Sequence, residues 1–207
     1  MIFHKVLDVL LSTWSHIAVL RVLQDSVHGL TGREIARQSG MNHRSCLRAL
    51  TTLEELSIVR RIRGGRDHLF SINREHLLIA EGILPLLGLE RKFFKEFTDV
   101  LKHLCGNQAE TIILFGSVAR REETAASDVD VCFLINKAAD KEKIQDILQK
   151  NSNAMVKRFG ARMSPIFFTR KEFSKKVEQK VPLVQLILSE GIIIKGKQIR
   201  RSVNATS

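Results

Sequence analysis

Two aspartates, Asp128 and Asp130, are the side chains in this sequence whose type and spacing most suggest chemistry. They stand at the start of an otherwise apolar run ending at Ile135, where carboxylates are costly to bury unless a cation partners them. Strand residues two apart project to one face, about 6–7 Å apart. Both are therefore placed to bind the same one or two divalent cations, which bridge phosphate oxygens and orient an attacking hydroxyl. We predict Mg²⁺ as the metal, with Mn²⁺ as an alternative.

A second group precedes the aspartates. Gly116 and Ser117 follow the apolar run "TIILF" directly, where glycine lets the backbone approach a ligand. Ser117 offers a hydroxyl and an N–H at a predicted helix start, a place that favours anions. We therefore predict that Gly116, Ser117, Arg120 and Ser127 bind a nucleoside triphosphate. Arg120 contacts either the phosphates or the turn itself, and Ser127 shapes the entry to the next strand. No Gly-Lys-Ser/Thr follows, so this is not a P-loop.

Strands must alternate with helices to position these groups. The apolar runs predict short strands, and the amphipathic segments between them predict helices. The predicted strands are residues 111–115, 128–135, 163–169 and 192–196, and the predicted helices are residues 140–160 and 170–191. Such alternation predicts a mixed sheet covered by helices, of α+β or α/β class, in a domain over residues 90–200.

The joint pattern resembles the signature of the polymerase-β-like nucleotidyltransferase superfamily: Gly116-Ser117, a ten-residue gap, then Asp128-x-Asp130. The "GSVAR" form is closest to the minimal nucleotidyltransferase subgroup, which includes antibiotic nucleotidyltransferases and antitoxin-type proteins. The resemblance covers about residues 95–195. It implies an enzyme that moves NMP from an NTP to a hydroxyl acceptor, with Asp128 and Asp130 as the catalytic metal ligands.

The chain departs from that pattern at one position. Active members of the family usually supply a third carboxylate from the next strand, as metal ligand or general base. The matching segment, "ARMSPIFFT", contains no acid; Ser164 is its polar candidate, and Pro165 interrupts the strand ladder. Glu122 and Glu123 lie in the preceding loop, but their spacing gives them no particular support as substitutes. Nucleotide binding survives this loss better than catalysis does.

The first third of the chain follows a different order, with three helices and a hairpin between His16 and Asn73. Thr31 and Glu34 have the spacing of a capping box at the start of the second helix, and Gly40 is suited to its end. Asn42 is placed to cap the third helix, "HRSCLRALTTLEELS", in which Cys46, Leu50 and Leu53 share one side while Arg44, Arg48 and Glu55 share the other.

Two short predicted strands, "IVRRIR" and "DHLFSI", complete this module. Gly64-Gly65 between them suits a two-residue turn. In that register Arg63 faces Arg66 and Arg61 faces His68, so one face of the hairpin is basic near its tip. Clustered like charges cost stability unless they meet a polyanion.

Residues 10–75 resemble the winged helix-turn-helix domains of bacterial and archaeal transcription regulators. The resemblance implies a third helix in the major groove of double-stranded DNA and a wing on the backbone or minor groove. The predicted DNA-binding residues are Arg44, Ser45, Arg48, Arg61, Arg63 and Arg66. Winged helices also serve as protein-protein or dimerisation modules, which is the alternative here.

We expect a winged-helix domain over residues 1–78, a linker over 79–89 and a tail over 201–207 around the nucleotidyltransferase domain. The helical pattern after the hairpin is interrupted near Pro85 and Gly88. The N-terminal "MIFHKVLDVLLSTWSH" has charges within its apolar part and predicts a helix rather than a secretory signal.

The composition of the chain indicates the kind of partner and the cellular compartment to expect. The chain has 207 residues and a net charge of +11, and residues 141–207 hold 15 Lys/Arg against 5 Asp/Glu. Such a basic field attracts phosphate-bearing partners, although lysine-rich helices also carry it as ordinary solvated surface. No apolar run is long enough for a membrane span. Three widely spaced cysteines, Cys46, Cys105 and Cys132, show neither metal spacing nor a disulfide framework, so we expect a cytoplasmic protein.

Two functions remain open. The first is a magnesium-dependent nucleotidyltransferase tethered to a DNA-binding module, which the retained Gly-Ser and Asp pairs favour. The second is a transcriptional regulator or antitoxin-like protein, with a toxin partner and a catalytically weak or inactive nucleotide-binding domain, which the missing third acid favours. Because winged helices commonly pair to read two half-sites, we also expect a homodimer.

Overall fold

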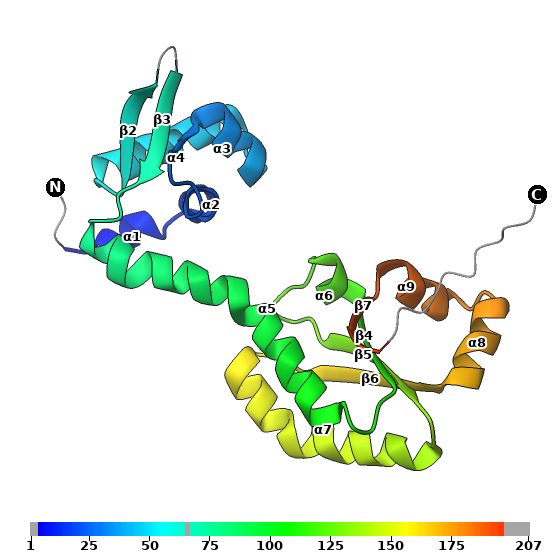
Figure 1. Ribbon diagram of the computed structural model, residues 1–207. Coiled ribbons are helices and arrows are strands. Elements are labelled where there is room, and N and C mark those ends of the chain that lie inside the picture. The colour runs from blue at the N-terminus through cyan, green and yellow to red at the C-terminus, as the bar shows by residue number, and fades with distance from the viewer. Residues whose placement is uncertain (1–3, 65–66, 197–207) are drawn as a thin grey trace, which may run out of the picture. The chain divides into compact units, whose positions relative to one another are not determined.

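The computed structural model describes residues 4–64 and 67–196 and divides into two compact units, Met1–Arg91 and Lys92–Ser207 (Figure 1). The long helix α5 (Leu84–Cys105) contains the point of division. Within the described residues, no helix has both the length and the apolar character that crossing a membrane would require.

The first unit contains the predicted order of three helices and a hairpin. Its elements are α1 (Val6–Leu10), α2 (Trp14–Leu23), β1 (Leu30–Thr31), α3 (Gly32–Ser39), α4 (His43–Glu55), β2 (Val59–Gly64) and β3 (Asp67–Ile72). The two-residue strand β1 was not predicted; it pairs with β3 and gives a three-stranded sheet of order β1-β3-β2. The predicted N-terminal helix is interrupted, because α1 ends at Leu10 and α2 begins at Trp14.

The predicted helix caps are confirmed. The Thr31 hydroxyl accepts a hydrogen bond from the Glu34 N–H, and the Glu34 carboxylate accepts one from the Thr31 N–H. Gly40 ends α3 with a φ of 69°, a left-handed conformation that glycine adopts at little cost. The Asn42 side chain accepts from the Arg44 N–H at the start of α4.

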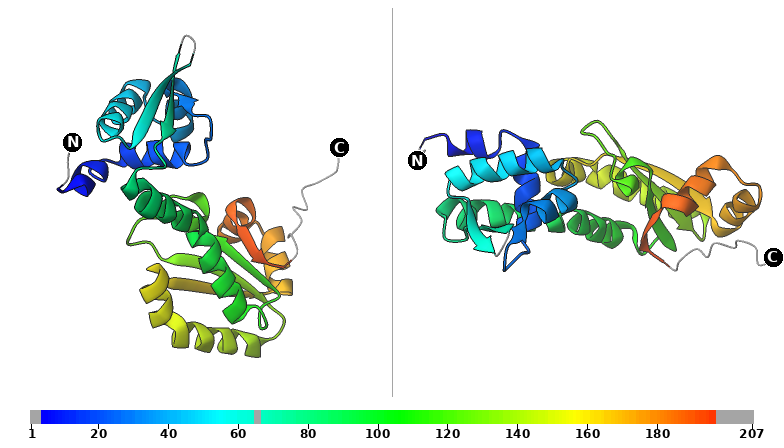
Figure 2. Two further views of the ribbon diagram at one scale, coloured as in Figure 1. Left: turned by 60° about the vertical axis from the view of Figure 1, so that its left-hand side comes forward. Right: turned by 90° about the horizontal axis from the view of Figure 1, so that it is seen from above.

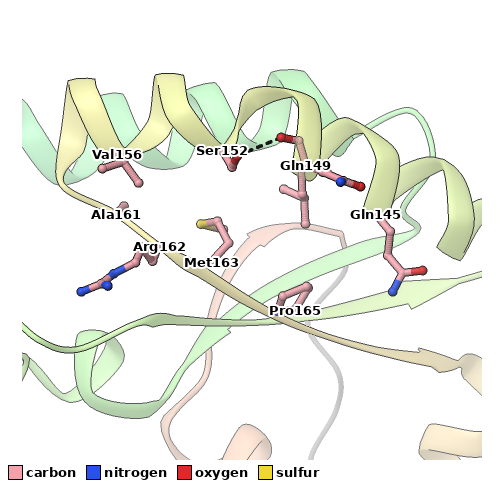
Figure 3. Close-up of a pocket in the computed structure, with 9 residues that line it drawn as sticks. Gln145, Gln149, Ser152, Val156, Ala161, Arg162, Met163 and Pro165 are labelled. Atoms are coloured by element: carbon pink, nitrogen blue, oxygen red, sulfur yellow. Dashed lines mark hydrogen bonds between the residues drawn. The ribbon is translucent and has the colours of Figure 1, made fainter.

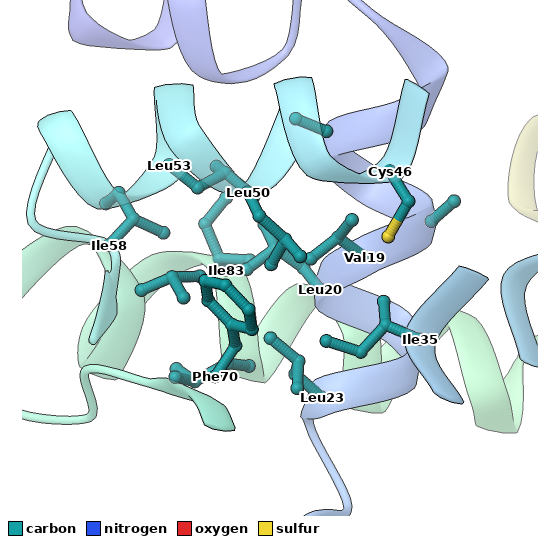
Figure 4. Close-up of a cluster of buried hydrophobic side chains, with 14 of the residues drawn as sticks. Val19, Leu20, Leu23, Ile35, Cys46, Leu50, Leu53, Ile58, Phe70 and Ile83 are labelled. Carbon is teal, nitrogen blue, oxygen red and sulfur yellow. The ribbon is translucent and has the colours of Figure 1, made fainter. Parts of the chain in front are cut away.

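The predicted apolar side of α4 forms part of the core of this unit. Cys46, Leu50 and Leu53 are buried, and Figure 4 shows them facing α2 and the side chain of Phe70 from the hairpin. Arg44, Arg48 and Glu55 lie on the exposed side of the same helix. The side-chain periodicity of α4 therefore leaves its basic positions in solvent.

The register of the hairpin differs from the prediction. Strands β2 and β3 form the hairpin (Figure 2). Gly64 pairs with Asp67 and Arg63 with His68, so Gly64 belongs to the paired ladder and Gly64-Gly65 is not the turn. Arg61 consequently lies opposite Phe70 rather than His68. The predicted partner of Arg63, Arg66, lies outside the described residues. The error arose because two adjacent glycines are compatible with a two-residue turn in more than one register. The pairing of β2 with β3 along its whole length selects one register.

The predicted interruption near Gly88 is wrong, because α5 continues through it. The segment before Pro85 is a wide π-helical turn, η1 (Leu78–Ile83), that passes directly into α5. Proline lacks an N–H and crowds the carbonyl four residues earlier, and a wider turn relieves that crowding without ending the helix.

The second unit is the predicted mixed sheet with helices. After α5 its elements are β4 (Thr111–Phe115), α6 (Gly116–Arg120), β5 (Val129–Ile135), α7 (Ala138–Phe159), β6 (Met163–Thr169), α8 (Arg170–Glu178), α9 (Pro182–Glu190) and β7 (Ile192–Lys195). The strand order is β6-β5-β4-β7, with β5 and β6 parallel and the other pairs antiparallel. The single helix predicted over residues 170–191 is two helices, because Pro182 starts a new one.

The two faces of this sheet have separate cores. On one face Val131 and Phe133 of β5 pack with residues of α5 and α7, and on the other Cys132 and Leu134 pack with residues of α8 and α9. Figure 1 shows α7 along one face and α8 and α9 beyond the other. Because side chains alternate along β5, Asp130 belongs with Cys132 and Leu134 on the α8–α9 face.

Candidate functional site

Asp130 lies against Gly116, which joins the end of β4 to α6. Asp130 pairs with Phe115 in the sheet, and a Cβ built on Gly116 would lie only 2.2 Å from Asp130 Oδ2. Gly116 also has a φ of 74°, which L side chains rarely adopt. The role of this glycine in the structure is thus to admit the Asp130 carboxylate. That carboxylate is half-buried and makes no hydrogen bond or ion pair with any residue the structure describes.

Asp128 is exposed, so the expectation that both acids are buried is wrong for this residue. β5 begins at Val129, and Asp128 stands just before it, where the chain still faces solvent. Its Oδ1 lies 3.6 Å from Nε of Arg162, in an ion pair whose side chains are 66% and 55% exposed. Arg162 also accepts a hydrogen bond at its carbonyl from the Val129 N–H. A cation of the chain therefore already faces one of the two acids.

Ser117 occupies the first turn of α6. It is half-buried, and its hydroxyl has no hydrogen-bond partner within residues 4–64 and 67–196. Its carbonyl accepts from the Glu122 N–H, which closes the chain after the short helix. The structure thus leaves the hydroxyl predicted to meet phosphate without a competing internal partner.

Arg120 contacts the protein on two sides. Its Nε donates to Glu122 over 2.7 Å, and its Nη1 donates to both carboxylate oxygens of Glu190 over 2.9 Å. These hydrogen bonds, the one to Glu122 first, raise the pKa of Arg120 above its usual value. Of the two roles predicted for Arg120, its contacts here are those of a residue that holds the turn.

Ser127 forms hydrogen bonds within the loop before β5. Its hydroxyl accepts from the Thr124 N–H over 3.0 Å, and its own N–H donates to the Thr124 carbonyl. These bonds match the predicted shaping of the strand entry. Binding of a nucleotide by Ser127 stays a prediction.

In the part of the chain that the structure describes, Asp128 and Asp130 are not joined by a third acid. No group of three His, Cys, Asp or Glu side chains is placed there to hold a metal. Ser164 of β6 lies directly beside Asp130 in the parallel ladder, as expected, and Pro165 follows it. Glu122 is committed to Arg120, and Glu123 is exposed. The residue of β6 that pairs with Asp130 is therefore a serine and not an acid.

A cavity of about 430 Å³ adjoins this edge of the sheet, between α7 and β6 (Figure 3). Met163 and Pro165 line it from β6, and Gln145, Gln149 and Ser152 line it from α7. Met163 packs with the core on the α7 face, whereas Asp130 lies on the other face. The cavity is therefore separated from Asp130 by the sheet, although Arg162 also lines it.

The cysteines are poor candidates for nucleophiles. All three are buried, and burial raises the pKa of the Cys105 thiol to about 11 and that of Cys132 to about 12. The pKa of Cys46 is raised for the same reason. Because the thiolate is the reactive form, these thiols are inert at neutral pH.

The residues predicted to bind DNA lie in the first unit. Arg44, Ser45 and Arg48 are exposed along α4, and Arg63 is exposed on β2. Arg61 is exposed too, but its Nε makes an ion pair of 3.1 Å with Glu54 of α4. Arg66 lies outside the described residues. These positions stay predictions.

Glu190 and Arg162 were not among the predicted site residues. Glu190 ends an amphipathic helix and Arg162 follows a helix-ending glycine, so each looks like an ordinary surface charge. Each meets its partner only through the sheet: β7 brings the end of α9 beside the end of β4, and β6 brings Arg162 beside the start of β5. The feature of the sequence that could have identified them is a charged residue directly next to a segment predicted to be a strand of this sheet.

Comparison with known proteins agrees with this geometry. The family model described as polymerase beta, nucleotidyltransferase, matches residues 98–200, which include the Gly116 turn and both aspartates. The Methanocaldococcus jannaschii protein named "Putative protein adenylyltransferase MJ0604" is 33% identical over 88 residues, or 42% of this chain and 82% of the relative. No solved structure matches the chain. From the turn, the acids and these matches together, we conclude that the chain belongs to the polymerase-β nucleotidyltransferase family.

Proposed function

We propose that the second unit is a magnesium-dependent nucleotidyltransferase that moves NMP from an NTP to a hydroxyl acceptor. The observation that carries this proposal is the half-buried Asp130 carboxylate, which lies against the Gly116 turn with no partner among the described residues. A carboxylate withdrawn from water without a partner is costly, and a bound cation removes that cost. Family membership supports the same chemistry.

The residues present fit Mg²⁺, or Mn²⁺ in its place. Both ions prefer oxygen ligands and are commonly held by one or two carboxylates together with waters and substrate phosphates. Asp130 and Asp128 would supply the carboxylates, with Asp128 turning from Arg162 toward the ion. When bound, the metal would neutralise phosphate charge and orient the attacking hydroxyl. Ser117 would donate its hydroxyl to the triphosphate, and the Arg162 guanidinium, next to Asp128, would offset further negative charge.

For the substrates, we propose ATP and a hydroxyl on a protein side chain. The support is the name of the M. jannaschii relative, "Putative protein adenylyltransferase MJ0604", of which this chain covers most of the length. The test is incubation with each α-labelled NTP and magnesium, followed by separation of protein, nucleic acid and small molecules. Label from ATP on protein is the expected result. Label on nucleic acid or a small molecule would reject the acceptor, and absence of any label would reject the enzyme.

A second candidate function is favoured by the serine beside Asp130 in β6. In this alternative the domain binds nucleotide but transfers little or none, and the chain acts as a transcriptional regulator or as the antitoxin of a toxin partner. Nucleotide binding in calorimetry, combined with no transfer in the labelling assay, would favour it over the enzyme.

For the first unit we propose a winged helix that binds double-stranded DNA through α4. The helices α2, α3 and α4, the three-stranded sheet with its hairpin, and the exposed Arg44, Ser45 and Arg48 on α4 support it. Pairing of two chains over two half-sites is part of the same proposal.

Replacing Arg44 and Arg48 with alanine should weaken duplex binding at all sequences and flatten its salt dependence. Each lost phosphate contact lowers the slope of log K against log salt by about 1. Fluorescence anisotropy with a labelled duplex at several salt concentrations measures both quantities. Arg60→Ala with Arg74→Ala removes the same charge outside α4 and should change little. Equal losses in the two double variants would reject α4 as the DNA-binding element.

A further inference from the structure

Glu190 lies at the junction that brings the C-terminal part of the second unit to the Gly116 turn. It is the last residue of α9, and β7 begins two positions later. Ile192 of β7 pairs with Leu114 of β4, and Gly116 begins just after β4 ends. The sheet therefore fixes the Glu190 backbone beside the turn, although the two residues are 74 positions apart.

One carboxylate accepts hydrogen bonds from two donor groups of this turn, the Gly116 N–H and the Arg120 guanidinium. Glu190 Oε1 accepts from the Gly116 N–H over 2.8 Å, and both of its oxygens accept from Arg120 Nη1 over 2.9 Å. The Glu190 side chain is only 13% exposed. The Arg120 hydrogen bond, and after it that from Gly116, hold the pKa of Glu190 below its usual range, so the carboxylate is ionised at neutral pH.

These two groups are among those that the sequence assigns to the nucleotide. A phosphate oxygen and the Glu190 carboxylate compete for the donors that Glu190 uses, the Gly116 N–H and Arg120 Nη1, because both are acceptors that carry negative charge. Displacing Glu190 would leave a largely buried carboxylate without these donors, which is unfavourable. The Ser117 hydroxyl, which has no internal partner in the described chain, remains available to phosphate.

We propose that Glu190 is a positioning residue of the nucleotide site: it holds Gly116 and Arg120 as parts of the turn and keeps the Gly116 N–H and Arg120 Nη1 from contacting phosphate. This inference rests on the proposed nucleotidyl transfer. Helix α6 has only five residues, too few to be stable alone. Arg120 links its end to Glu122 in the following loop and to Glu190 on α9. The position of Ser117 relative to Asp130 then depends on the Arg120–Glu190 pair.

A double-mutant cycle tests the proposal. Arg120→Ala and Glu190→Gln should each weaken magnesium-ATP binding about tenfold, the size expected for one lost charge-assisted contact. The double variant should be no worse than either single variant, because the two side chains act as one unit. Binding is measured by calorimetry with the full chain, well below each variant's melting temperature. Glu122→Gln, which removes the same charge from the exposed partner of Arg120, should stay within about twofold.

A readout of the Gly116 amide separates positioning from a general effect on stability. In the NMR spectrum of the wild type this amide should shift as Glu190 is protonated, at a pH below the ordinary pKa of glutamate. The pKa of Glu190 is lowered in the folded state. The hydrogen bond from Gly116 to Glu190 is therefore present above the ordinary pKa of glutamate and is lost as the pH falls through the lowered pKa. The shift should be absent in Glu190→Gln, and magnesium-ATP should leave the wild-type titration in place.

Three results would overturn the proposal: Glu190→Gln binding ATP as well as or better than the wild type, the two single effects multiplying in the double variant, or magnesium-ATP abolishing the titration of Gly116. Multiplied effects would mean that Arg120 contacts phosphate independently. If the wild type binds no magnesium-ATP, the proposed function fails instead, and the titration of Gly116 by Glu190 is still observed.

Discussion

Replacing Asp128 and Asp130 together with asparagine is expected to abolish magnesium-dependent NTP binding and to reduce nucleotidyl transfer on the order of a thousandfold or more. Asparagine preserves the size of each side chain but removes the negative charge that holds the metal. Asp130 should account for most of the loss, because it is the half-buried acid without a partner in the described chain. Asp128 already faces Arg162, so its single variant should lose less.

The matched control removes two acids from the exposed side of α7. Glu142→Gln with Asp146→Asn makes the same change of net charge away from the turn and should bind NTP as the wild type does. Calorimetry with NTP, with and without magnesium, compares the two double variants. The duplex binding proposed for the first unit should be unchanged in both. Equal NTP affinity of the Asp128 and Asp130 variant and the wild type would show that the site is assigned wrongly.

Replacing Gly116 with alanine is expected to have the second largest effect. The new Cβ would lie 2.2 Å from Asp130 Oδ2, closer than nonbonded atoms approach, so the carboxylate or the turn must move. The φ of 74° adds a strain of about 1–2 kcal/mol. NTP binding should therefore be lost together with part of the stability, because a displaced Asp130 no longer shares a metal with Asp128.

Gly160 provides the control for backbone strain alone. It ends α7 with a φ of 67°, and a Cβ built there meets nothing within 4 Å. Gly160→Ala should cost about 1–2 kcal/mol in chemical denaturation and leave NTP affinity unchanged. If Gly116→Ala binds NTP as Gly160→Ala does, the contact between the turn and Asp130 has no role in nucleotide binding.

Local patterns were sufficient to predict most of the elements. The capping pair Thr31 and Glu34, the left-handed end at Gly40 and the fully apolar strand β4 each satisfy a requirement within a few residues. The mixed sheet and the nucleotidyltransferase family followed from the order of strands and from the Gly-Ser and Asp-x-Asp spacing, and the family match confirms the latter. The winged-helix interpretation of the first unit stays a prediction.

The errors concern features that are not determined by the residues immediately around them in the sequence. The hairpin register depends on the whole ladder between β2 and β3, and two adjacent glycines left the turn ambiguous. Asp128 was expected to be buried because apolar residues follow it, but the strand begins one residue later. Glu190 and Arg162 contact their partners only because the sheet brings distant segments together. Their contacts therefore could not be predicted from the spacing of residues in the sequence.

In the proposed site, Asp128 and Asp130 hold a divalent metal beside the Gly116 turn. A crystal of the full chain grown with manganese and a non-hydrolysable ATP analogue, measured at an absorption edge of the metal, tests it directly. The expected result is an anomalous peak within bonding distance of both carboxylates, with the analogue's phosphates on the side of Ser117. Nucleotide density without a peak between the two acids, or a peak held by other residues, would contradict the claim.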